Sequence, residues 1–168
     1  EFENILLVRL DHLGDLACTF PAIGILRKRY PKARVTVLTG EWNRQALDTT
    51  LADEVIVYNS PRFSRHRQAT SSRDDRRRLL SSLRNMKPDL VVGFRDDFST
   101  IIGALCLGVR ARADRGSARI AWQLKRFLDR VRGHQVPEEL HEIETNCLSL
   151  RPILGDVDLQ EYQLRPAM

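Results

Sequence analysis

Two aspartates follow the first apolar run of the chain at positions suited to proton transfer. The run Ile5-Leu6-Leu7-Val8 leads into a polar stretch, Arg9 to Asp15, that contains both Asp11 and Asp15. A carboxylate beside an acceptor hydroxyl can act as a general base. Aspartate is equally common as a helix-capping residue, so both interpretations are open at Asp15 and at Asp11.

These residues need a loop between a strand and a helix to position them. Apolar residues at Ile5 to Val8 predict a strand buried on both faces. Helical spacing resumes at Leu16, Phe20, Ile23, Leu26 and Tyr30. In a parallel sheet this loop faces the ligand crevice, so His12 and Gly14 are further candidates for binding a substrate.

A second group of candidates is a cluster of arginines. Ser60 to Met86 holds eight arginines and two aspartates, a net charge of +6, whereas the whole chain carries +5. Ser60 to Arg73 lacks periodicity, and long polar loops in compact domains are often functional. We expect Arg62, Arg65 and Arg67 to clamp anionic groups, because guanidinium groups match phosphates and carboxylates. Arg76 to Arg78 are expected on an exposed helix face.

Weaker candidates follow other strands. Arg95 and Asp96 come after the strand predicted at Pro88 to Phe94, where they would line the cleft; the alternative is that Asp97 only caps the next helix. Trp42 is interpreted either as a sugar contact or as a core residue, and His141 as a structural histidine or a ligand contact. Asp96 and Asp97 do not form a spaced metal-binding carboxylate pair.

Composition indicates a soluble, globular domain. The 168 residues are 42% hydrophobic and 29% charged, and no apolar run is long enough to cross a bilayer. Cys18, Cys106 and Cys147 are odd in number and lie in apolar stretches, which favours free thiols and a cytoplasmic protein.

Strands and helices alternate along the chain, which predicts an α/β fold with a doubly wound, Rossmann-like parallel sheet. Further strands are expected at Arg34–Leu38, Glu54–Tyr58 and Val109–Ala113. The expected helices are Trp42–Leu47, Asp74–Met86, Ser99–Leu107, Ala118–Arg132 and Glu138–Leu154, the last one closed by Gly155. Asp156 to Met168 is interpreted as a linker.

Several motifs occur in an order that resembles glycosyltransferase family 9, the ADP-heptose:lipopolysaccharide heptosyltransferases. They are the basic residue after the first strand, the pair Gly14-Asp15, the Thr-x-Pro-Ala of the first helix, and Pro-x-Ala before the second strand. His141-Glu142-Ile143-Glu144 resembles the family's H-x-x-E helix. The resemblance covers Ile5 to Gly155.

This resemblance implies the N-terminal half of a two-domain GT-B glycosyltransferase. Residues 1–155 would be the acceptor-binding domain, with Asp15 as catalytic base, and 156–168 the linker to an absent donor-binding domain. The implied acceptor is a lipopolysaccharide core or related glycan, and the implied donor is ADP-heptose or a related nucleotide sugar, with no cofactor or metal. We expect a cytoplasmic monomer, inactive by itself. Charges on Ala118–Arg132 suggest peripheral association with the inner membrane.

A different class of function also fits the basic cluster. A non-enzymatic α/β module that binds RNA or other anions would use the same arginines. Against it, Phe63 is the only aromatic residue among them that could stack on bases.

Overall fold

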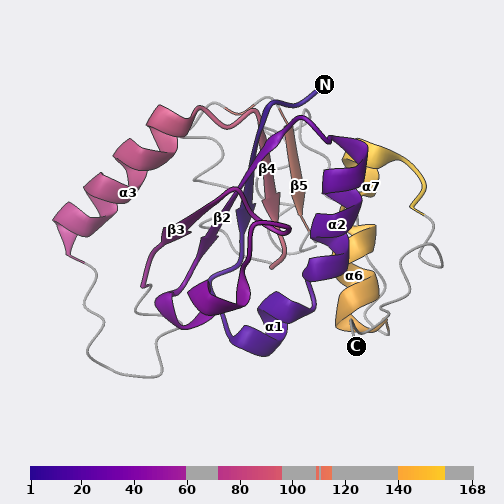
Figure 1. Ribbon diagram of the computed structural model, residues 1–168, viewed down its shortest axis with the longest axis horizontal. Helices are drawn as coiled ribbons and strands as arrows, with labels where there is room; N and C mark the ends of the chain where they lie inside the picture. The colour runs from indigo at the N-terminus through magenta and orange to yellow at the C-terminus, as the bar shows by residue number, and fades with distance from the viewer. Residues whose placement is uncertain (60–71, 96–108, 110, 115–139, 158–168) are drawn as a thin grey trace, which may run out of the picture.

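A five-stranded sheet forms the centre of the molecule (Figure 1). The computed structural model describes residues 1–59, 72–95, 109, 140–157 and the backbone of 111–114. The strands are β1 (Asn4–Val8), β2 (Arg34–Thr39), β3 (Glu54–Val57), β4 (Leu90–Gly93) and β5 (Ala111–Asp114), in the order β3-β2-β1-β4-β5. Every pairing is parallel, with Ile5 opposite Val35 and Leu90. This confirms the predicted α/β parallel sheet.

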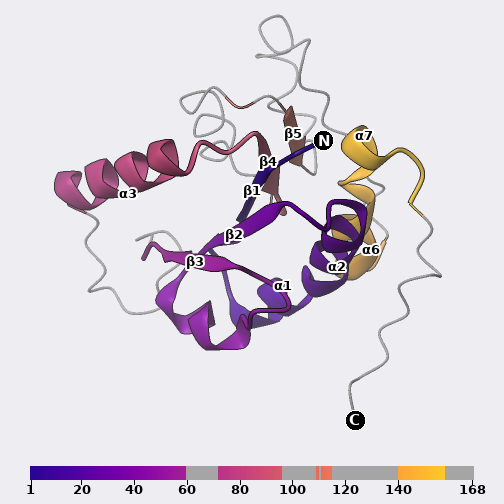
Figure 2. The ribbon, with the colours of Figure 1, turned by 45° about the horizontal axis from the view of Figure 1, so that its top comes forward.

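Helices cover both faces of the sheet (Figure 2). On one face α2 (Phe20–Arg29), α6 (Glu142–Leu148) and α7 (Arg151–Leu154) pack on alternate side chains of the central strands, such as Ile5, Val35 and Leu90. On the other face Leu83 of α3 (Arg73–Met86) packs with Leu6 and Val91. The central strand β1 is buried on both faces, as its continuous apolar run predicts.

The carboxyl end of the sheet carries two short helical segments. They are α1 (Leu13–Ala17), which follows β1, and a 3₁₀ helix, η1 (Glu41–Ala46), which follows β2 (Figure 1). The two segments contact each other. They bring the loops after β1 and β2 together, where the sequence places its candidate carboxylates.

Two predicted helices are each divided in the structure. The helix expected from Leu16 to Tyr30 is α1 followed by α2, and the one expected at Glu138–Leu154 is α6 followed by α7. Pro21 and Pro152 lie in the first turns of α2 and α7. Proline has no N–H to continue a preceding helix, so each chain segment restarts its hydrogen-bond pattern there. The helix expected at Trp42–Leu47 is the 3₁₀ helix η1.

Other boundaries agree with the sequence. Helix α3 begins after Ser72, whose hydroxyl accepts from Asp75 N at 3.0 Å, and Arg76 to Arg78 are exposed as predicted. Gly155 ends α7 with a φ of +77°. The predicted helices at 99–107 and 118–132 and the tail from 158 onward lie outside the described residues. None of the described helices is long and apolar enough to span a membrane.

Candidate functional site

Arg9, the first residue after β1, is the centre of a charge cluster at the carboxyl end of the sheet. Its side chain is only 3% exposed. Nε lies 2.6 Å from Asp11 Oδ1, Nη1 donates to the Phe94 carbonyl, and Nη2 lies 3.1 Å from Glu142 Oε1. Arg9 therefore joins the ends of β1 and β4 to helix α6.

Asp11 is buried and held by two arginines. Besides Arg9, Arg95 Nη1 lies 3.1 Å from Asp11 Oδ2, and the Asp11 side chain is 3% exposed. The Asp11 carbonyl accepts from Trp42 Nε1 at 2.7 Å and from Asn43 Nδ2 at 2.9 Å. These bonds lock the loop after β1 onto η1, which explains why a polar loop holds one conformation here.

Asp15 has a more open environment than Asp11. Its side chain is 41% exposed, and its Oδ1 lies 3.6 Å from Arg9 Nη2. Asp15 Oδ2 accepts from the backbone N–H of His12 at 3.3 Å, so Asp15 also caps α1. The capping interaction that the sequence left open is therefore present, and it uses only one carboxylate oxygen.

The structure brings together five of the residues singled out from the sequence. They are Asp11, His12, Gly14, Asp15 and Arg95, all at the carboxyl end of the sheet. His12 and Gly14 are exposed, and Arg95 is partly exposed. Arg62, Arg65, Arg67 and Asp96 lie outside the described residues.

Helix α6 contributes residues whose roles the sequence left open or did not reveal. His141 caps α6, since its Nδ1 accepts from Ile143 N at 3.3 Å, which is a structural role. Asn146 is buried and donates from Nδ2 to the Cys18 carbonyl at 3.0 Å. Glu142, which reaches Arg9, is the residue that sequence reasoning missed. Its only sequence signal is its place in the His141-Glu142-Ile143-Glu144 motif.

The two described cysteines are free thiols, as expected. Burial raises the pKa of Cys18, Glu142 raises it further, and Arg9 lowers it. Burial also raises the pKa of Cys147 to about 11, with a contribution from Glu144. Cys18 is only partly buried and lies directly after α1, so the pKa of its thiol depends on the charges of this cluster.

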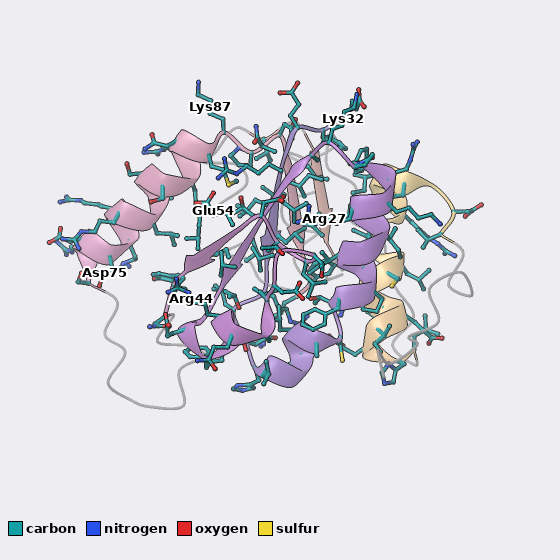
Figure 3. The ribbon with its side chains drawn as sticks, viewed as in Figure 1. Arg27, Lys32, Arg44, Glu54, Asp75 and Lys87 are labelled. Carbon is teal, nitrogen blue, oxygen red and sulfur yellow. The ribbon has the colours of Figure 1, made fainter. Side chains whose placement is uncertain are left out.

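Trp42 has features of both interpretations, a core residue and a possible sugar contact. Its ring packs against Gly40 and its Nε1 is bound to the loop, yet the residue is 37% exposed. Neighbouring Arg44 extends outward from η1 (Figure 3). Trp42 is thus a fixed, half-open aromatic surface beside the Asp11 loop.

Comparison with known proteins gives structural matches alone. No family profile matches the sequence, and no curated protein does. The structure is similar to a family 9 glycosyl transferase from Veillonella parvula, at 20% identity with a TM-score of 0.67 over 93% of this chain and 42% of that one. It is also similar to E. coli heptosyltransferase WaaC solved with ADP-2-deoxy-2-fluoro heptose, at 18% identity with a TM-score of 0.71 over 92% and 49%.

A third match is E. coli ADP-heptose lps heptosyltransferase II, at 23% identity with a TM-score of 0.62 over 86% of this chain and 39% of that one. The chain thus spans less than half the length of each of these structures. At such identities the shared property is the fold. The expectation of an α/β fold like the N-terminal half of GT-B heptosyltransferases is confirmed.

Proposed function

We propose that this chain is the acceptor-binding domain of a GT-B glycosyltransferase and that Asp15 is its catalytic base. The donor is ADP-heptose or a related nucleotide sugar, and the acceptor is a lipopolysaccharide core or similar glycan. The observation that carries the proposal is a half-exposed carboxylate beside a buried arginine, at the carboxyl end of a sheet with the fold of heptosyltransferases. In parallel α/β sheets this end is where ligands bind.

The reaction needs one base and one leaving group. As the acceptor hydroxyl oxygen forms a bond to the anomeric carbon, the bond from that carbon to the diphosphate oxygen breaks. The acceptor's proton passes to Asp15, and the diphosphate leaves with the bonding electrons. The diphosphate would lie on a second domain that binds the donor.

Asp15 suits the role of base better than Asp11. An acceptor hydroxyl can approach Asp15, which is 41% exposed, whereas Asp11 is 3% exposed and paired with Arg9 and Arg95. The role of Asp11 in acceptor binding is then indirect: it orients Arg95. A cationic, partly exposed Arg95 suits phosphate or carboxylate groups on the acceptor.

The other residues of the proposed acceptor site are assigned from their side-chain chemistry and their place in the chain. His12 and Gly14 flank Asp15 on the exposed loop and α1, so they would contact the sugar near the attacking hydroxyl. Arg62, Arg65, Arg67 and Asp96 complete the proposed site, with the arginines binding anionic substituents of the inner core. The acceptor is a membrane glycolipid, so the enzyme would work in the cytoplasm as a monomer at the inner-membrane surface.

The proposal is tested by what the chain binds. Titration calorimetry with lipopolysaccharide core oligosaccharide, ADP-heptose and single-stranded RNA, each at about 50 and 200 mM salt, separates the candidate functions. We expect binding of the oligosaccharide and none of ADP-heptose. Arg95→Gln should weaken oligosaccharide binding by roughly tenfold, the usual effect of losing a charge-assisted hydrogen bond.

Arg34→Gln is the matched control for Arg95. Arg34 pairs with Glu54 at 2.9 Å at the opposite end of the sheet, so its loss should leave oligosaccharide affinity unchanged. Tight, strongly salt-dependent binding of RNA without binding of the oligosaccharide would instead support the anion-binding module.

A further inference from the structure

The Nη2 nitrogen of Arg9 is shared between two carboxylates from distant parts of the chain. Its Nη2 lies 3.1 Å from Glu142 Oε1 on α6 and 3.6 Å from Asp15 Oδ1 on α1. The first distance is a hydrogen bond and the second is a longer ion pair. Nε and Nη1 of Arg9 are engaged by Asp11 and by the Phe94 carbonyl, so Nη2 is the nitrogen that lies between Glu142 and Asp15.

The length of the contact between Arg9 and Asp15 matters for proton transfer. A short, charge-assisted hydrogen bond from a guanidinium group stabilises the ionised carboxylate and weakens it as a base. Without the charge on Glu142, Asp15 would be the one carboxylate among the described residues that pairs with Nη2. The pair would then close to hydrogen-bond distance.

We propose that Glu142 is a positioning residue for Asp15: it binds Arg9 Nη2 and holds this nitrogen back from Asp15 Oδ1, which stays available to accept a proton. This inference rests on the proposed function of Asp15. Glu142 acts on Asp15 through Arg9. Glu142 lies on α6, which packs on α2. A shift of α6 against α2 would therefore move Glu142 and change the distance between Arg9 and Asp15.

The matched pair of variants is Glu142→Gln and Glu144→Gln. Both remove one negative charge from α6, but Glu144 Oε2 accepts from His141 N at 3.2 Å as part of the helix cap. In a crystal structure of Glu142→Gln, the distance between Arg9 Nη2 and Asp15 Oδ1 should shorten to about 2.9 Å. In Glu144→Gln the distance should stay near 3.6 Å.

The reactivity of two cysteines depends on the charges of these two glutamates in solution. Glu142 contributes to the raised pKa of Cys18, and Glu144 to that of Cys147. Because the thiolate is the reactive form, Glu142→Gln should speed alkylation of Cys18 at about pH 8 and leave Cys147 unchanged. Glu144→Gln should leave the alkylation rate of Cys18 unchanged, and mass spectrometry of the alkylated peptides separates the two thiols.

Turnover of the complete gene product tests the consequence. Glu142→Gln should lower kcat by roughly threefold to tenfold at unchanged acceptor KM, and shift the acidic limb of the pH profile to lower pH. Glu142→Asp, which keeps the charge, should recover part of the loss. Among the described residues, Arg9, His12 and Cys18 contact Asp15 or interact with its charge, whereas Asp11 and Glu142 pair with Arg9, and Arg95 pairs with Asp11.

The possible outcomes separate the two proposals. An unchanged distance from Arg9 to Asp15, or an unmoved pH profile despite a shortened distance, would overturn the role of Glu142. If the geometry and Cys18 respond as expected but no form of the protein transfers a sugar, the proposed function fails and the catalytic role of Glu142 fails with it. A kcat effect equal in Glu144→Gln would mean that only helix capping matters.

Discussion

At the residue scale, burial separates chemically similar side chains into different roles. Asp11 and Asp15 lie four positions apart in one loop, yet the first is enclosed by two arginines and the second opens to solvent. Arg9 is the reason, because its buried guanidinium needs carboxylate partners and Asp11 is the nearest. The sequence shows both aspartates but not which of them Arg9 encloses.

Gly40 gives a prediction at this scale. A Cβ added to Gly40 would lie 2.5 Å from the Trp42 ring, which is fixed by its bond to the Asp11 carbonyl. The ring has to shift and break that bond, so Gly40→Ala should lower the free energy of unfolding by about 1–3 kcal/mol. Chemical denaturation measures the change.

Gly24→Ala is the control for Gly40. Gly24 is exposed within α2 and an added Cβ would meet nothing within 4 Å, so alanine should stabilise the protein by about 0.5–1 kcal/mol. Equal effects of the two substitutions would show that packing of Trp42 on Gly40 is unimportant.

At the element scale, one carboxylate joins α2, β2 and the entry to β3. Asp53 Oδ2 accepts from Val35 N at 2.7 Å, and Arg27 Nη1 of α2 lies 3.1 Å from the same oxygen. Burial acts to raise the pKa of Asp53, but the bond from Val35 N and the pairing with Arg27 outweigh it and hold the pKa below its usual value.

This lowered pKa predicts a pH-dependent stability. A group with a depressed folded-state pKa stabilises the fold above its unfolded pKa of about 4, and this stabilisation is lost as the pH falls through the folded value. Asp53→Asn should therefore lower the urea midpoint at pH 6, and the difference from wild type should shrink below about pH 4. A difference that is constant from pH 3 to about pH 7 would contradict this account.

Much of the element order could be predicted from the sequence, and the failures have a physical cause. The apolar runs of β1, β2 and β4 are strong signals because both faces of these strands are buried. The divisions at Pro21 and Pro152 were missed because the apolar spacing continues across both breaks, although each proline was visible. Side-chain contacts over long sequence distances, such as Arg9 with Glu142, leave no periodic pattern to detect.

At the scale of the whole molecule, the fold is established, whereas the catalytic role of the site is a proposal. The sheet order, helix layers and similarity to heptosyltransferase structures establish the fold over most of the chain. The proposed catalytic role depends on one carboxylate, and this chain spans less than half of each of the structures it matches. A decisive assay therefore supplies the protein with both proposed substrates and with the donor-binding domain that the proposal requires.

That assay is the turnover of Asp15→Asn. Asparagine keeps the shape of Asp15 and an oxygen that accepts from His12 N, so α1 remains capped, but the base is lost. We expect kcat to fall by roughly 10²- to 10⁴-fold while acceptor affinity and thermal stability stay close to wild type.

The matched control is Asp53→Asn. Asp53 is as exposed as Asp15, at 41%, and likewise pairs with an arginine and accepts a backbone N–H, but it lies at the other end of the sheet. It should lose some stability and keep its turnover. Turnover is measured as nucleoside diphosphate released from the donor in the presence of acceptor. Near-normal turnover in Asp15→Asn would contradict the assignment of Asp15 as the base.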